Sequence, residues 1–138
     1  MSMSERTKTS NGVKAVLFDI DGVLMDSFEA NLKYFQSIFA RAGYRTPTKS
    51  AYREVFHKTF ADILTHFTGP EQREERERLQ EIGAAEPYPM HLLNAPRGAK
   101  EAVRSLARNY KLGIVSNRRQ IGIERYFTFA KTKQYFTV

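Results

Sequence analysis

The sequence predicts an α/β fold, in which a parallel sheet with helical crossovers carries an inserted helical domain. Two short apolar runs, residues 13–20 and 110–117, have the composition of strands buried on both faces of a sheet. The segments between and after them carry apolar residues at helical spacing. This strand–helix–strand order implies parallel strands, because a parallel pair needs a long crossover connection.

The first strand and the helix after it follow from one continuous stretch. Residues 13–20, VKAVLFDI, are almost entirely apolar and lead into an Asp-Gly turn. From Phe28 onward, apolar residues recur every three or four positions, which predicts a helix with one buried face. We expect Asp26 or Ser27 to cap this helix and Gly43 to end it.

Four further helices and a linker are expected. Residues 48–67 predict a second helix, residues 70–83 a charged, solvent-facing helix, and residues 86–96, with three prolines, a linker. Short helices are expected near 98–109 and 119–130, on either side of the second strand. The inward face of the second helix is expected to comprise Tyr52, Val55, Phe56, Ile63, Leu64 and Phe67.

This order divides the chain into a tail and two domains. Residues 1–12 are polar and predict a flexible N-terminal tail. The α/β core is expected to comprise residues 13–25 together with residues 92–138. The inserted helical domain is expected to comprise residues 26–91.

The composition is typical of globular proteins outside membranes. Of the 138 residues, 41% are hydrophobic, and no apolar run approaches the roughly 20 residues that span a bilayer. The N-terminus lacks the apolar stretch of a secretory signal, and without cysteine the chain has no disulfides or thiolate metal sites. We therefore expect a cytoplasmic protein with no membrane partner.

The net charge of +7 is unevenly distributed along the chain. Residues 1–96 carry 12 basic and 13 acidic residues, whereas residues 97–138 carry 10 basic and 2 acidic residues. Because the bases are scattered singly and form no known binding motif, we do not expect a nucleic-acid partner. The imbalance is better explained if the acidic complement of the fold lies in sequence that is not part of this chain.

Polar side chains follow both predicted strands. Asp19 and Asp21 come after the first strand, and Ser116 and Asn117 after the second. The carboxyl ends of parallel strands meet at one edge of a sheet, where α/β proteins bind ligands. Mg²⁺ prefers hard oxygen ligands, and it would offset the repulsion between two carboxylates and bind a phosphoryl group. A plain acidic turn is the alternative interpretation.

Two segments resemble motifs of a known family. FDIDGVLMDS, residues 18–27, resembles the first motif of the haloacid dehalogenase (HAD) superfamily, in its phosphoglycolate phosphatase-like branch. LGIVSNR, residues 112–118, resembles the second motif, and the helical insertion between them is similar to the cap domain of that branch. The resemblance extends over residues 13–138. It implies a Rossmann-like HAD core with a helical cap, and a Mg²⁺-dependent hydrolase that forms an aspartyl-phosphate intermediate.

The resemblance also implies a role for each polar residue at the sheet edge. Asp19 would be the nucleophile and a Mg²⁺ ligand. Asp21 would be the general acid/base and would bind Mg²⁺ through its backbone carbonyl. Ser116, with Asn117 beside it, would hold the phosphoryl group. Because dehalogenases that resemble this chain have no carboxylate at position 21, the expected substrate is a small phosphorylated metabolite.

The chain departs from the family pattern after the second motif. Members of the family continue well beyond it and supply a phosphate-binding lysine and further acidic Mg²⁺ ligands. Neither Lys131 nor Lys133 has the sequence surroundings of that lysine. We therefore expect the chain to be an N-terminal portion that is inactive alone. Apolar residues such as Ile114, Val115, Phe127 and Phe136 would be poorly covered, which would favour self-association or a retained C-terminal segment.

Two alternatives remain open. A sugar-phosphate mutase of the same branch would use the same aspartates but return the phosphoryl group to a sugar rather than to water. A non-catalytic HAD-like binding domain would keep the fold without the reaction. Transfer to a sugar phosphate distinguishes the first alternative, and a natural reading frame that ends at Val138 would favour the second.

Overall fold

Two parallel strands form the sheet that the sequence predicts. In the computed structural model, which describes residues 12–137, β1 (Ala15–Phe18) pairs with β2 (Lys111–Ile114). The pairing runs in register from Ala15 opposite Lys111 to Phe18 opposite Ile114. Both strands have four residues and are shorter than the apolar runs that predicted them.

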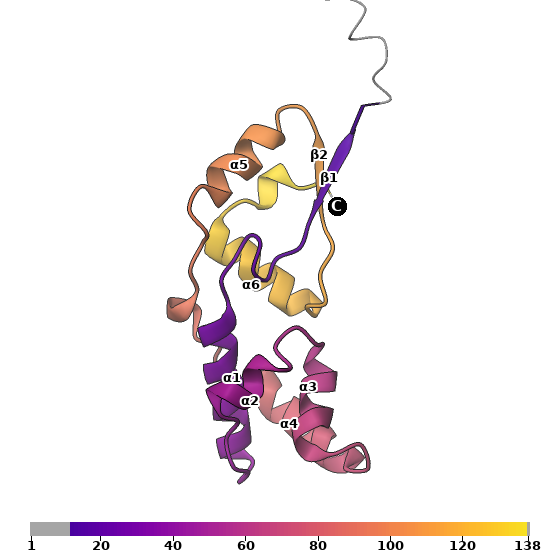
Figure 1. The fold of residues 1–138 in the computed structure, drawn as a ribbon, viewed down its shortest axis with the longest axis vertical. Coiled ribbons are helices and arrows are strands. Elements are labelled where there is room, and N and C mark those ends of the chain that lie inside the picture. Colours follow the sequence, from indigo (N-terminus) through magenta and orange to yellow (C-terminus); the bar gives the residue numbers. More distant parts are fainter. Residues whose placement is uncertain (1–11, 138) are drawn as a thin grey trace, which may run out of the picture.

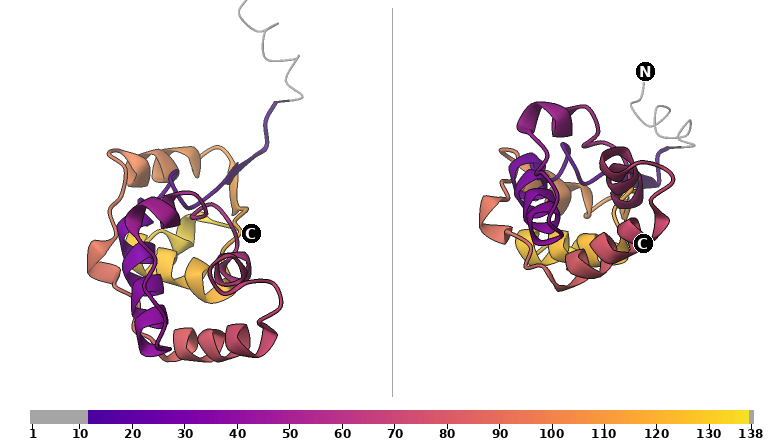
Figure 2. Two further views of the ribbon diagram at one scale, coloured as in Figure 1. Left: turned by 60° about the horizontal axis from the view of Figure 1, so that its bottom comes forward. Right: turned by 90° about the horizontal axis from the view of Figure 1, so that it is seen from below.

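The helices fall into two groups (Figures 1 and 2). Helices α5 and α6 lie beside the strands, and helices α1 to α4 form a separate bundle at the carboxyl ends of the strands. This arrangement confirms the α/β class with an inserted helical domain. The bounds of the helices are α1 (Phe28–Arg41), α2 (Lys49–Arg53), α3 (Phe60–Thr68), α4 (Arg73–Ala85), α5 (Ala99–Leu106) and α6 (Gln120–Ala130), with short 3₁₀ turns η2 (Met90–Leu92) and η3 (Lys133–Tyr135).

Two hydrophobic clusters stabilise these groups. The first lies within α1 to α4 and contains the fully buried Phe39, Tyr52 and Leu79. The second lies between the strands and α5 and α6, and it contains Ile20 and Tyr126. Separate clusters agree with two domains, and the boundaries at residues 25/26 and 91/92 stay predictions.

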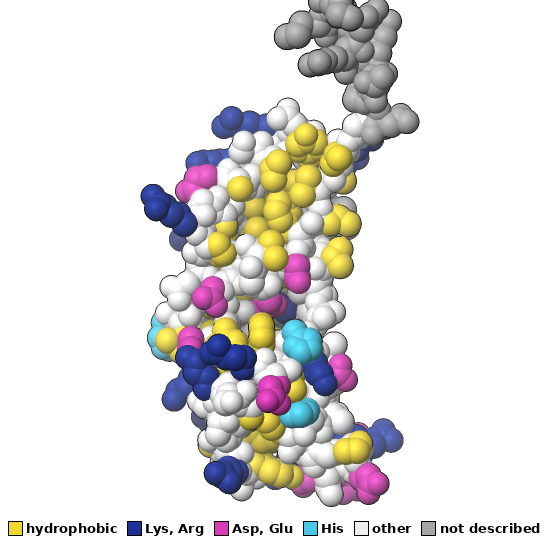
Figure 3. All heavy atoms as spheres, viewed as in Figure 1, with side chains coloured by type: hydrophobic (Ala, Val, Ile, Leu, Met, Phe, Trp, Pro, Cys, Tyr) yellow, Lys and Arg dark blue, Asp and Glu magenta, His cyan; other side chains and the backbone are white. Residues whose placement is uncertain are grey.

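The expectation that both strands are buried on both faces is wrong for the described residues. Leu17 is 64% exposed and Val115 62%, whereas Val16 and Phe18 pack into the second cluster. Alternate residues of a strand point to opposite faces, and helices α5 and α6 cover one face. Figure 3 shows the resulting apolar side chains on the surface of the α/β domain. Of the residues expected to be poorly covered, Val115 is exposed and Ile114, Phe127 and Phe136 are half-buried.

The single helix expected over residues 48–67 is two helices. The chain turns between α2 and α3, and Thr59 caps α3 by accepting a hydrogen bond from the N–H of Asp62 at 3.2 Å. Because of this turn Phe56 is 45% exposed rather than buried, whereas Tyr52 and Leu64 face inward as expected.

The chain passes between the two domains twice, and the two connecting segments are hydrogen-bonded to each other. The N–H of Asp26 donates to the carbonyl of Asn94 at 2.7 Å, and the N–H of Asn94 donates back at 3.1 Å. This pair ties the exit from the α/β domain to the return from the helical domain. Among the described residues, no helix has the length and apolar character needed to cross a bilayer.

Candidate active site

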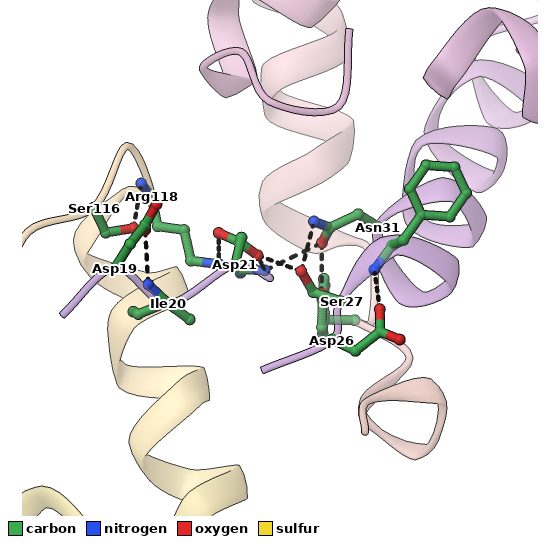
Figure 4. A network of polar contacts seen from close by, with 10 residues as sticks. Asp19, Ile20, Asp21, Asp26, Ser27, Asn31, Ser116 and Arg118 are labelled. Atoms are coloured by element: carbon green, nitrogen blue, oxygen red, sulfur yellow. Dashed lines mark hydrogen bonds and ion pairs between the residues drawn. The ribbon is translucent and has the colours of Figure 1, made fainter. Parts of the chain in front are cut away.

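Asp19 and Asp21 lie in a tight turn directly after β1 (Figure 4). The backbone carbonyl of Ile20 accepts hydrogen bonds from the N–H groups of residues 23–25 at 2.9 to 3.2 Å. Gly22 has a φ angle of 75°, which glycine adopts without the strain that a Cβ would impose. Through this turn, both aspartates line one cavity between the α/β and helical domains.

Ser116 and Asn117 follow β2 on the neighbouring strand. The N–H of Val115 donates to the carbonyl of Phe18 at 2.9 Å, which extends the pairing to the turn that carries the aspartates. Asn117 lines the same cavity as the aspartates, as the topology predicts. Ser116 is half-buried, and its Oγ accepts a hydrogen bond from the backbone N–H of Arg118 at 3.1 Å; it is not among the described residues that line the cavity.

Arg118 forms a two-pronged ion pair with Asp21. Its Nε and Nη2 donate to the two carboxylate oxygens of Asp21 at 2.8 and 2.7 Å, a bidentate geometry that adds directionality to the charge attraction. The Arg118 side chain is 11% exposed and that of Asp21 34%. The sequence analysis assigned no role to Arg118. Its position directly after Asn117 was the one feature of the sequence that could have indicated a place in the site.

A chain of hydrogen bonds connects Asp21 to the helical domain. Ser27 donates its hydroxyl to Asp21, and Asn31 donates to the Ser27 hydroxyl at 3.4 Å. Tyr88 in turn donates to the Asn31 carbonyl at 2.5 Å. Ser27 lies at the N-cap position of α1 and was one of the two expected caps. Its side chain makes no capping hydrogen bond because its hydroxyl donates to Asp21 instead. None of these three residues was assigned to the site from the sequence.

Burial and charge in this network act on the pKa values of its members. Burial lowers the pKa of the Arg118 guanidinium, but the hydrogen bonds and charge of Asp21 outweigh it and leave the pKa above its usual range. Burial raises the pKa values of Tyr52 and Tyr88, so both phenols are neutral at physiological pH. Arg118 is therefore a permanent cation beside the carboxylate of Asp21.

The cavity itself is small and has mixed chemistry. Its volume is about 180 Å³, and carboxylates, basic groups and aromatic rings all contribute to its walls. The helical domain contributes most of the rings, including Tyr34, Phe35, Tyr52, Phe56 and Phe60. The walls of the cavity are therefore partly charged, from the aspartates and the basic groups, and partly aromatic, from the helical domain.

The residues present fit a divalent cation in part. Asp19 Oδ1 accepts the N–H of Ile20 at 2.7 Å, and no ion pair among the described residues involves the carboxylate of Asp19. Residues 12–137 contain no group of three or more acidic, histidine or cysteine side chains that could hold a metal. Mg²⁺ is commonly held by one or two carboxylates with water and phosphate as its other ligands, and Asp19 fits that role.

The fold and the turn after β1 define a class of proteins: α/β proteins with a two-aspartate turn after the first strand and an inserted helical domain. Residues 16–138 match the family model of haloacid dehalogenase-like hydrolases. The chain therefore belongs to this family. None of the curated proteins matches it.

Several solved structures have a similar fold. A HAD-superfamily hydrolase of subfamily IA, variant 1, from Geobacter sulfurreducens is 28% identical, with a TM-score of 0.65 over 93% of this chain and 63% of that chain. A predicted phosphoglycolate phosphatase from Haemophilus somnus is 16% identical, with a TM-score of 0.73 over 91% and 60%. CbbY from Rhodobacter sphaeroides, in complex with phosphate, is 18% identical, with a TM-score of 0.68 over 85% and 56%. The chain thus spans less than two thirds of the length of these structures.

Proposed function

We propose that the protein hydrolyses a small phosphorylated metabolite in a Mg²⁺-dependent reaction that passes through an aspartyl-phosphate. The observation that carries the proposal is the convergence of Asp19, Asp21 and Asn117 on one cavity, at the carboxyl ends of two parallel strands. The family match supports a hydrolase. The phosphatase neighbour from Haemophilus somnus supports phosphate esters as the substrate class.

Asp19 is the nucleophile in this proposal. Its carboxylate is solvent-exposed and accepts a hydrogen bond from the N–H of Ile20, which leaves oxygen lone pairs available toward the cavity. One oxygen attacks phosphorus, the bond from phosphorus to the ester oxygen breaks, and the alcohol leaves. Water then attacks the phosphorus of the aspartyl-phosphate, which releases phosphate and restores the carboxylate.

Asp21 is the general acid/base. It protonates the leaving ester oxygen in the first step and takes a proton from the attacking water in the second. Both of its carboxylate oxygens accept hydrogen bonds from Arg118 in the observed conformation, so Asp21 must exchange this partner before it can donate a proton. Arg118 therefore holds the carboxylate of Asp21 in a resting position.

Asp19 and the backbone carbonyl of Asp21 would hold Mg²⁺, which would neutralise charge on the phosphoryl oxygens. Ser116 and Asn117 would bind the phosphoryl oxygens by hydrogen bonds from the neighbouring strand end. The hydroxyl of Ser116 accepts a hydrogen bond from the N–H of Arg118, so its own proton is free to be donated to a phosphoryl oxygen.

The test uses the complete gene product, meaning the whole polypeptide that the gene containing this sequence encodes. It is incubated with p-nitrophenyl phosphate, with Mg²⁺ or with EDTA, beside its Asp19→Asn variant. We expect hydrolysis with Mg²⁺, loss of hydrolysis with EDTA, and loss of nearly all turnover in the variant at unchanged circular dichroism. Activity of Asp19→Asn within tenfold of the unmodified protein would exclude Asp19 as the nucleophile, and transfer of phosphate to a sugar phosphate instead of water would indicate a mutase.

A further inference from the structure

The cavity carries more basic charge than the proposed reaction uses. Four cationic side chains line it, Lys58, Arg118, Arg119 and Arg125, against the two carboxylates of Asp19 and Asp21. Arg118 is paired with Asp21. Lys58, Arg119 and Arg125 take part in none of the ion pairs found among the described residues. Three positive charges therefore face the cavity without an acidic partner in this part of the chain.

Two of these cations are held in place by aromatic rings of the helical domain. The guanidinium of Arg119 lies 3.9 Å from the ring centroid of Phe60, and that of Arg125 lies 5.5 Å from Tyr34 and 4.6 Å from Tyr88. Stacking on a ring fixes a guanidinium while leaving its N–H groups available for an anion. Arg119 and Arg125 are thus oriented by α6 and the helical domain together.

Tyr52 provides an independent observation in the same cavity. Its side chain is fully buried, and its hydroxyl has no hydrogen-bond partner in the structure. The polar groups that act on the pKa of this phenol are Tyr88, Asp21, Arg118 and Asn31. Because buried polar groups are nearly always hydrogen-bonded, this hydroxyl is a donor that a ligand oxygen can satisfy.

We propose that Arg119, Arg125 and Lys58, together with the hydroxyl of Tyr52, form an anion-binding subsite for the organic part of the substrate. The substrate is then a phosphomonoester with a second acidic group, either a carboxylate or a second phosphate. This inference rests on the proposed phosphatase function. An enclosed anion loses its hydrating water and needs charged hydrogen-bond donors to compensate. The three unpaired cations are such donors, and they are additional to the groups proposed to contact the transferred phosphoryl group.

The experiment compares three two-carbon phosphates that differ at one end: ethyl phosphate, phosphoglycolate and ethane-1,2-diyl bisphosphate. Values of kcat/KM are measured for the complete gene product and for Arg119→Gln, Arg125→Gln and Tyr52→Phe. Arg104→Gln, which removes an exposed cation of α5 outside the cavity, serves as the control. The variant at the exposed Arg119 keeps the test valid if a variant of the half-buried Arg125 does not fold.

We expect one of the two diacidic substrates to exceed ethyl phosphate in kcat/KM by about tenfold or more, the scale of one charge-assisted hydrogen bond. The substrate that does so identifies the acid as carboxylate or phosphate. Arg119→Gln and Arg125→Gln should reduce this ratio, mainly through KM, and Arg104→Gln should not. Equal use of all three substrates, or an equal loss on all three in the variants, would overturn the subsite while leaving the phosphatase intact. Absence of any phosphatase activity, with p-nitrophenyl phosphate included, would overturn both proposals.

Discussion

Arg118 binds both carboxylate oxygens of Asp21 across a separation of 97 residues in the sequence. The contact joins the turn after β1 to the start of α6, and Ser27 extends it to the helical domain. One ion pair thus connects the expected acid/base to both halves of the molecule. Its two roles, in stability and in catalysis, can be measured separately.

The first prediction concerns the stability of this pair. Asp21→Ala leaves the mostly buried guanidinium of Arg118 without its partner, and we expect a loss of about 1–3 kcal/mol in the free energy of unfolding. Urea denaturation of Asp21→Ala, Arg118→Met and the double variant measures the coupling between the two residues. A coupling energy indistinguishable from zero would show that the pair contributes nothing to folding.

The second prediction concerns Ser116. In the proposed function, Ser116→Ala removes one hydrogen bond to a charged phosphoryl group, which is worth about 1–3 kcal/mol and corresponds to a loss of roughly 5- to 150-fold in turnover. The measurement is kcat with p-nitrophenyl phosphate beside Asp19→Asn. A loss as severe as that of Asp19→Asn would assign Ser116 a larger role than phosphate binding.

The third prediction concerns Tyr52 and alkaline pH. Because burial raises the pKa of Tyr52, the folded state keeps this phenol protonated at pH values where the unfolded chain, with an ordinary pKa of about 10, releases the proton. The contribution of this phenol to stability should therefore not vary with pH below about pH 10, and stability should fall as the pH rises above it. Tyr52→Phe should weaken that alkaline decline, as measured by urea denaturation between pH 8 and about 11.

At neutral pH the same variant loses a hydroxyl that has no partner. Tyr52→Phe should then leave the free energy of unfolding unchanged or raise it by up to about 1 kcal/mol. A loss of 2 kcal/mol or more would show that the hydroxyl has a partner in the folded protein without ligand.

The fourth prediction concerns residues 1–138 expressed alone. Asp19 is the proposed metal-binding carboxylate among the described residues, and neither Lys131 nor Lys133 has the sequence surroundings of the family's lysine, so we expect no measurable hydrolysis of p-nitrophenyl phosphate in excess Mg²⁺. The exposed Leu17 and Val115 should also promote association, which size-exclusion chromatography detects. A monomer with the turnover of the complete gene product would contradict this prediction.

The sequence predicted the features that depend on residues close together in the chain, and it missed features that depend on residues far apart in the chain. The strands and α1 were predicted because a local apolar pattern determines them, and the turn at Gly22 because its residue types allow few alternatives. The exposure of Leu17 could not be predicted, since burial of a strand face depends on which elements pack against it. The turn that divides residues 48–67 was missed because the apolar spacing continues through it.

The same distinction applies to the candidate site. The meeting of Asp19 and Asn117 at one cavity followed from strand topology and could be predicted. The pair between Arg118 and Asp21 could not, because an arginine near a motif has many possible partners until the fold is known. The roles assigned to the four predicted site residues remain predictions for enzymology to test.

The most direct test of the account is identification of the phosphorylated residue. The Asp21→Asn variant of the complete gene product keeps the proposed nucleophile, Asp19, but loses the proposed base that activates water, and p-nitrophenolate is a leaving group that needs no protonation. After reaction with p-nitrophenyl phosphate and Mg²⁺ and rapid acid quenching, mass spectrometry of the peptides should locate a phosphoryl group on Asp19. Hydrolysis by the unmodified protein without any phosphorylated Asp19 in this variant, or with the phosphoryl group on another residue, would contradict the account.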